Sequence, residues 1–252
     1  MVKIMGIINL TPDSFWESSR YNMSILDSRA EIVDVGAVST RPGAADVSLE
    51  EEWSRLEPFL ERWKSYPVDK SLSVDTTRAE IVRRVYDMVG KFIVNDISAG
   101  EDDPAMLATV GALGLEYIAM HKRGNPRTMD ALADTGVPIM EQLSEYFALF
   151  AQKAQSYGIV DWVLDPGLGF AKTKEQNIEI VERLPELKKF GRPILIGAAD
   201  KRFTDGNTEK YHLLALERGA DILRVHDVDA AYRTYAQYEH ECKKCKQQPI
   251  QP

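Results

Sequence analysis

Cysteine and long apolar runs are scarce in this sequence of 252 residues, and its 31 Lys and Arg residues are outnumbered by 39 Asp and Glu residues. No window approaches the roughly 18 uninterrupted apolar residues of a membrane span. The apolar start of the chain is short and contains Lys3, which argues against a signal peptide. The formal net charge of −8 argues against a general surface for nucleic acid or anionic membranes. We therefore expect a soluble, cytoplasmic protein with neither nucleic acid nor membrane as a partner, in which a local cluster binds any anion.

Several familiar site patterns are also incomplete. Cys242 and Cys245 lie three residues apart in a Lys-rich tail, but no second Cys pair completes a zinc site. The segment from Gly167 to Gly169 lacks the third glycine of a dinucleotide fingerprint, and Lys172 lacks the preceding glycine of a P-loop. We interpret residues 1–240 as one domain and residues 241–252 as a polar C-terminal tail, the frayed end of a last helix.

The sequence does contain eight short apolar segments, most of them followed by an amphipathic one. One of them, Trp162 to Leu164, stops at Asp165, and Thr173 with Gln176 then forms a capping box for a helix. The predicted strands cover residues 3–10, 31–36, 72–74, 92–97, 116–120, 162–164, 193–196 and 221–225. Because composition does not change along the chain, a single α/β domain, the (β/α)8 TIM barrel, fits better than two domains. A doubly wound open sheet is the structural alternative.

Polar residues lie where most of these strands end. In a parallel barrel the carboxyl ends of all strands meet at one face, where ligands bind. The polar residues expected at that face are Asn9, Thr40, Arg41, Asp75, Asn95, Asp96, His121, Asp165, Lys201, Arg224 and His226. So many polar groups are hard to explain by packing, and they predict a binding site.

Part of this set suits a pyrophosphate. Arg41, Arg224 and His226 supply hydrogen-bond donors for phosphate oxygens, although an arginine taken alone is more often paired with a neighbouring aspartate. Asn9 offers one neutral oxygen to Mg²⁺, a cation that can take its other ligands from pyrophosphate and water.

The remaining acceptors suit a heterocycle. Asp75, Asn95 and Asp165 form an acceptor-rich set of the kind expected around a ring that presents several N–H donors. Two carboxylates can instead be the acid and base of a glycosidase, but the sequence gives no other sign of a sugar cleft. The residues alone leave both interpretations open.

Seven segments resemble the signatures of dihydropteroate synthase, in family order and over nearly the whole chain. The longest are Gly6 to Phe15 (GIINLTPDSF) and Asp34 to Gly43 (DVGAVSTRPG). The others lie at residues 73–76, 95–98, 120–126, 164–170 and 224–228. The resemblance implies a homodimeric barrel enzyme of folate biosynthesis. Such a transferase joins 6-hydroxymethyl-7,8-dihydropterin pyrophosphate to p-aminobenzoate, and releases pyrophosphate and 7,8-dihydropteroate.

The resemblance also implies roles for individual residues. The pterin site is implied at Asp75, Asn95, Asp165 and Lys201, and Thr40 and Phe170 are implied as further substrate-binding residues. The pyrophosphate and Mg²⁺ site is implied at Asn9, Arg41, Arg224 and His226. The p-aminobenzoate site is implied at Phe15, Pro42 and Arg202. Asp165, Lys201, Arg224 and His226 are the expected catalytic residues.

The chain departs from the family pattern at several places. Ala199 to Arg202 (ADKR) stands where the family usually has Ser-Arg-Lys-Ser, so Arg202 either pairs with the carboxylate of p-aminobenzoate or fills its pocket. The segments after the first strand and after Lys201 look short, which predicts shortened first and seventh βα units. A relative that transfers a methyl group from methyltetrahydrofolate, and a non-catalytic pterin-binding barrel, remain alternatives.

Overall fold

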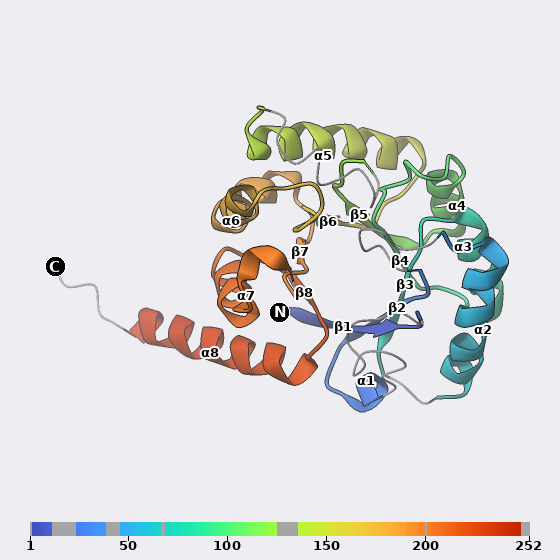
Figure 1. Ribbon diagram of the computed structural model, residues 1–252, viewed down its shortest axis with the longest axis horizontal. Helices are drawn as coiled ribbons and strands as arrows, with labels where there is room; N and C mark the ends of the chain where they lie inside the picture. Colours follow the sequence, from blue (N-terminus) through green and yellow to red (C-terminus); the bar gives the residue numbers. More distant parts are fainter. Residues whose placement is uncertain are drawn as a thin grey trace.

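The chain folds as a ring of parallel strands with helices around it (Figure 1). This computed structural model describes residues 2–11, 24–38, 46–66, 69–124, 136–199 and 201–247, with side chains up to residue 242. The strands follow the order β6-β5-β4-β3-β2-β1-β8-β7. An isolated parallel bridge between Leu164 and Ile194 joins the two ends of this order. The sheet is therefore a nearly closed barrel, and the predicted (β/α)8 architecture is confirmed.

The strands are short and apolar because the barrel interior covers one face and helices cover the other. They are β1 (Lys3–Asn9), β2 (Ile32–Gly36), β3 (Ser71–Asp75), β4 (Ile93–Asp96), β5 (Glu116–Met120), β6 (Trp162–Asp165), β7 (Leu195–Ile196) and β8 (Ile222–Val225). β7 is shorter than the predicted strand at residues 193–196. Pro193 has no N–H for the ladder, although its carbonyl accepts a bond of 2.9 Å from the amide of Leu164.

The helices form the outer layer of the barrel (Figure 1). They are α1 (Ser24–Asp27), α2 (Leu49–Ser65), α3 (Ala79–Val89), α4 (Met106–Leu113), α5 (Ile139–Ser156), α6 (Lys174–Glu182), α7 (Thr208–Glu217) and α8 (Val228–Gln247), with 3-10 helices η2 (Leu184–Phe190) and η3 (Arg202–Thr204). α1 has only four residues. The predicted domain boundary at residue 240 lies within α8, which continues to Gln247. Within the described residues no helix is long and apolar enough to cross a membrane.

The sequence located the start of α6 from a local signal. The capping box of Thr173 and Gln176 is present in both directions, with bonds of 3.1 and 3.2 Å. α4 begins three residues after Asp103, because the Asp103 carboxylate accepts from the amide of Ala105 at 2.9 Å and holds a turn first. The prediction missed η2, where Leu184 and Leu187 are buried at the three-residue spacing of a 3-10 helix.

The barrel interior has two layers. The lower layer is a buried apolar cluster of Met5, Ile32, Ile93, Ile118, Val163, Leu195 and Ile222. Side chains alternate along a strand, so the residue two positions later also points inward, one layer nearer the carboxyl end. Four of those positions hold Asp34, Asn95, Asp165 and Arg224. The strand period therefore gathers charged and amide groups at one end of the barrel.

Candidate active site

The upper interior layer is the candidate site. It combines Asp34 on β2, Asp75 on β3, Asn95 on β4, Asp165 on β6 and Arg224 on β8. Asp34, Asn95 and Asp165 are buried, whereas the side chains of Asp75 and Arg224 are 17% and 24% exposed. Asp75 lies directly opposite Asn95 in the β3–β4 ladder. The structure thus brings together the predicted pterin acceptors and Arg224.

Arg224 is held between two carboxylates. Its Nε donates to Asp34 Oδ2 at 2.7 Å, and its Nη2 donates to Asp75 Oδ2 at 2.9 Å. Asp34 also accepts from Ser73 Oγ at 2.6 Å and from Asn95 Nδ2 at 3.1 Å. The ion pair that the sequence offered as an alternative for each arginine is therefore present at Arg224. Three strands other than β2 donate to Asp34, which makes it the centre of the layer.

Asp34 was not among the predicted site residues. It is fully buried in the segment Ile32–Gly36 (IVDVG), where every other residue is apolar or glycine. A charge at such a position is costly unless it is paired, so a lone aspartate within an apolar strand was the available signal. The sequence could not identify its partner Arg224, because 190 residues separate the two.

Burial alters the acidity of the site. It raises the pKa of Asp75 to about 7, against the attraction of Arg224, which lowers it. Burial likewise raises the pKa of Asp165, and the amide of Gly167 opposes that shift by donating to Asp165 Oδ1 at 2.7 Å. Asp75 therefore titrates near neutral pH, and we expect ligand binding at its carboxylate to depend on pH.

Lys201 and Phe170 meet beside Asp165. The Lys201 ammonium lies 4.4 Å from the centroid of the Phe170 ring. A Cβ added to Gly169 would lie 2.8 Å from Cδ of Lys201, so the aliphatic part of the lysine rests on glycine backbone. The charge of Lys201 also acts on Asp165. The structure therefore places Lys201 and Phe170 together beside Asp165.

Asn9 and His226 lie at the carboxyl ends of neighbouring strands. Asn9 ends β1, His226 follows β8, and the two strands pair in parallel. Both residues are partly buried. Among the described residues, no group of three or more His, Cys, Asp or Glu side chains could hold a metal. This donor set fits a Mg²⁺ ion that takes one neutral oxygen from the protein and its other ligands from phosphate and water.

Four predicted residues fall outside the part of the chain that the structure describes. They are Phe15, Thr40, Arg41 and Pro42. Arg202 is described: it begins η3, next to Lys201, and its side chain is exposed. An exposed Arg202 remains available to a carboxylate.

Asp96 and His121 do not belong to the site, and their predicted places at the polar face were wrong. Asp96 accepts from the amides of Ser98 and Gly100 and from the hydroxyl of Tyr117, at 2.7, 2.9 and 2.6 Å. The ring of His121 packs edge-on against Tyr146 of α5, with centroids 4.8 Å apart. Each follows an inward-facing residue, so strand alternation turns it outward toward the helices.

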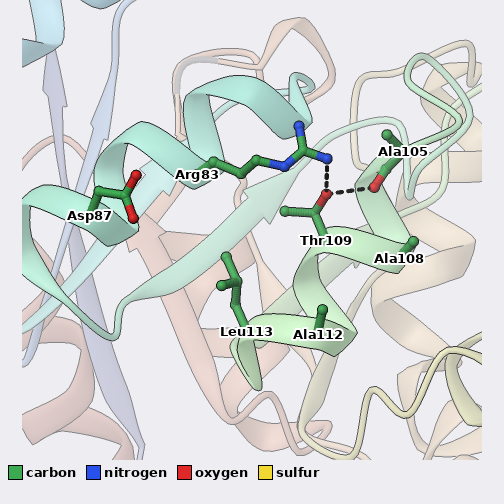
Figure 2. A pocket seen from close by; sticks show the side chains of 7 residues that line it. All are labelled: Arg83, Asp87, Ala105, Ala108, Thr109, Ala112 and Leu113. Atoms are coloured by element: carbon green, nitrogen blue, oxygen red, sulfur yellow. Dashed lines mark hydrogen bonds between the residues drawn. The ribbon is translucent and has the colours of Figure 1, made fainter.

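A cavity of about 380 Å³ lies elsewhere, between α3 and α4 (Figure 2). It is lined by Arg83, Asp87, Ala105, Ala108, Thr109, Ala112 and Leu113. Arg83 Nη2 donates to Thr109 Oγ1 at 2.8 Å, and that hydroxyl donates to the carbonyl of Ala105 at 2.8 Å. The cavity contains none of the predicted site residues and lies outside the barrel.

Comparisons with known proteins identify the family of the chain. The sequence model of the family described as "Pterin binding enzyme" matches residues 5–226. A dihydropteroate synthase of Synechocystis sp. is 39% identical over 250 residues, which cover 90% of this chain and 86% of that protein.

Solved structures give the same result. The dihydropteroate synthase of Thermus thermophilus in complex with 4-aminobenzoate has a TM-score of 0.82 and 33% identity, covering 95% of this chain and 94% of that one. The Coxiella burnetii dihydropteroate synthase in complex with pteroic acid has a TM-score of 0.82 and 27% identity, covering 95% and 93%. The residues of the upper layer, the barrel and these relatives together place the chain in the dihydropteroate synthase family of pterin-binding enzymes.

Proposed function

We propose that this chain condenses 6-hydroxymethyl-7,8-dihydropterin pyrophosphate with p-aminobenzoate, giving 7,8-dihydropteroate and pyrophosphate with Mg²⁺ as cofactor. The observation that carries the proposal is the set of acceptors formed by Asp75, Asn95 and Asp165 beside the guanidinium of Arg224. Such a set suits a heterocycle with several N–H groups that is joined to an anionic leaving group.

Asn95 is oriented for an N–H ligand. Its Nδ2 donates to Asp34 at 3.1 Å, so its carbonyl oxygen points away from that carboxylate and stays an acceptor. Asp165 keeps one carboxylate oxygen for a ligand while Oδ1 accepts from Gly167. The pterin ring would lie against Lys201 and Phe170, whose cation–π contact presents a flat surface at this end of the barrel.

Arg224 can bind the leaving group without losing its bonds to the carboxylates of Asp34 and Asp75. Its bonds to Asp34 and Asp75 use Nε and Nη2. The two N–H groups of Nη1 take part in neither bond, and a guanidinium binds phosphate oxygens well. His226 and Asn9, on the adjacent strand ends, would complete this side of the site together with Arg41. Bound Mg²⁺ would neutralise charge on the leaving pyrophosphate.

The charges of the protein oppose those that develop in the reaction. As the bond between the pterin methylene and pyrophosphate breaks, positive charge grows on the methylene and negative charge on the leaving oxygen. Anionic Asp165 stabilises the first and Arg224 the second, because both are held in place before the substrate arrives. The aniline nitrogen of p-aminobenzoate then needs positioning more than activation.

The p-aminobenzoate site rests on family likeness. Phe15, Thr40 and Pro42 would close over the ring, and exposed Arg202 would pair with its carboxylate. Arg202→Ser restores the residue type usual in the family. We expect this variant to change KM for p-aminobenzoate and leave KM for the pterin substrate as it is. The homodimer implied by the likeness also remains a prediction, which light scattering of the purified protein tests.

Pyrophosphate release tests the proposed reaction. Purified protein receives the pterin pyrophosphate and Mg²⁺, with and without p-aminobenzoate, beside the variants Asp165→Asn and Asp229→Asn. Asp229 is exposed on α8 and serves as the matched control. The synthase is supported if pyrophosphate release requires p-aminobenzoate and yields dihydropteroate. Release should also collapse in Asp165→Asn and persist in Asp229→Asn. Calorimetric binding of the pterin pyrophosphate without release contradicts it and identifies a non-catalytic pterin-binding relative.

A further inference from the structure

Lys172, in the loop between β6 and α6, is buried although it carries an ammonium group. Its Nζ donates to the carbonyl oxygens of Gly167 at 2.8 Å, Phe170 at 3.0 Å and His121 at 3.2 Å. An ammonium has three N–H donors, so backbone carbonyls take all of them. Burial lowers the pKa of Lys172 well below its usual range. The three carbonyls oppose this shift, because only the protonated amine can donate to all of them.

The loop backbone is bent around this ammonium. Gly167, Gly169 and Ala171 have φ values of 69°, 78° and 49°, so every second residue is left-handed. A Cβ on Gly167 would lie 2.1 Å from the carbonyl oxygen of His121, so the two loops meet with no room for a side chain. Such a path is unfavourable without partners for the carbonyls that it turns inward. Lys172 supplies those partners.

The same loop carries the pterin side of the site. Asp165 begins it, and Phe170 with Lys201 stacked on it lies near its end. Asn177 of α6 binds the other side of this loop, because its Oδ1 accepts from the amide of Gly169 at 2.7 Å. The third carbonyl that Lys172 binds, that of His121, lies outside this loop and directly follows β5. Lys172 therefore ties the loop that bears Asp165 and Phe170 to the neighbouring strand, and its charge acts on Asp165.

We propose that Lys172 is a positioning residue for the pterin subsite: by binding three backbone carbonyls it fixes Asp165 and Phe170 relative to β5. This inference rests on the proposed function, because it assigns Asp165 and Phe170 to the pterin. A buried, unpaired charge costs more than an apolar side chain of similar size, so packing alone does not explain a lysine here. If Lys172 positions only the pterin subsite, its substitution should weaken binding of the pterin pyrophosphate and leave binding of p-aminobenzoate unchanged.

Lys172→Met tests the proposal, because methionine fills similar space without donors or charge. We expect Kd and KM for the pterin pyrophosphate to rise about 10- to 100-fold, the loss typical of charge-assisted hydrogen bonds. KM for p-aminobenzoate is expected to stay within about twofold, since that substrate contacts other loops. Lys174→Met is the matched control: Lys174 is exposed, pairs with Asp205 at 2.5 Å and lies two residues away.

A second variant, Lys172→Gln, retains two N–H donors and no charge, and we expect a smaller rise in Kd than in Lys172→Met. Calorimetry on the folded fraction, checked by circular dichroism, separates affinity from folding. Unchanged pterin affinity in either folded variant overturns the inference, as does an equal loss for both substrates. Failure of both variants to fold also overturns it, because Lys172 is then structural. If the unsubstituted protein binds no pterin pyrophosphate, the proposed function itself fails.

Discussion

The two layers inside the barrel differ in chemistry although four strands, β2, β4, β6 and β8, supply residues to both. The lower layer consists of buried apolar side chains such as Met5 and Ile118. The upper layer, two residues further along these four strands, includes Asp34 and Arg224, and Asp75 of β3 completes their network. Since the backbone geometry is shared, the difference lies in the side chains alone. Burying an apolar side chain stabilises the fold by about 1.5–3 kcal/mol, whereas burying charges does so only if they are well paired.

This difference predicts that the layer in which a residue lies decides which property its substitution changes. Residues of the lower layer should act mainly on the free energy of unfolding, and residues of the upper layer mainly on the affinity for substrate. The following predictions test how far the separation holds, beginning with the substitutions that should have the largest effects.

The first prediction compares one substitution in each layer. Ile118→Ala, in the lower layer, should reduce the free energy of unfolding by about 4 kcal/mol, because a cavity remains in a packed core. Asp34→Asn removes one of the two carboxylates that pair with Arg224, but Asp75 remains and Arg224 is 24% exposed, so the variant should lose less than about 3 kcal/mol, the usual cost of breaking a fully buried pair. It should raise Kd for the pterin pyrophosphate by about 100-fold, since Asn95 and Arg224 lose their common partner. Urea denaturation and calorimetry measure the two quantities, and similar losses of stability in both variants would contradict the separation.

The second prediction concerns the rim of the upper layer. Gly167→Ala should destabilise the protein by about 3 kcal/mol or more, because its Cβ would meet the His121 carbonyl and φ is 69°. Gly158→Ala is the matched control, with φ of 71° and nothing within 4 Å of the added Cβ. It should lose only about 1 kcal/mol, from the backbone conformation alone. Equal losses in urea denaturation would show that the contact with β5 is not a constraint.

Much of this arrangement could be predicted from the sequence. Apolar runs located the strands, and the residues at their ends, such as Asp75 and Asp165, were assigned to the correct face, because strand ends in a barrel are fixed by connectivity. Asp96 was assigned to the wrong side. It directly follows Asn95, and only the register of β4 decides which of the two neighbours points inward.

Pairing over long distances could not be predicted. The bonds of Lys172 depend on three carbonyl groups, which carry no sequence signal, and on a loop whose shape comes from alternating left-handed residues. Asp34 could be recognised as an anomaly within an apolar strand, but its partners come from three other strands. Sequence reasoning finds residues that local chemistry marks and misses those whose role is assembled by the fold.

The third prediction examines a buried polar group outside the barrel. His212 lies in α7, and its Nε2 finds no partner in the described part of the chain. Burial lowers the pKa of His212 from 6.5 to about 4. The unfolded imidazole binds a proton below about pH 6.5, whereas the folded one stays neutral. The stability that depends on neutral His212 is thus complete above pH 6.5 and falls as the pH approaches 4, by about 2 kcal/mol at pH 5.

His212→Leu should remove this part of the pH dependence, measured as the free energy of unfolding in urea between pH 5 and pH 7.5. The same substitution at exposed His240 is the control and should leave the slope unchanged. A slope that survives His212→Leu would assign the pH dependence to other groups. Because His212 lies on an outer helix and not at a strand end, substrate affinity should not change in either variant.

The smallest effect is expected at two left-handed residues, Asp205 and Ala171, which share a φ of 49°. Glycine relieves about 1 kcal/mol of backbone strain at such a position. Asp205→Gly also removes the ion pair between Asp205 and Lys174, but an exposed ion pair contributes little to stability. Asp205→Gly should therefore stabilise the protein by about 0.5 kcal/mol. Ala171 is 2% exposed, so Ala171→Gly also removes a buried methyl group worth about 0.8 kcal/mol. The two effects nearly cancel, and its stability in urea should stay within about 0.5 kcal/mol of the parent. A clear gain at Ala171 would mean that the loop around Lys172 is strained rather than held by its contacts.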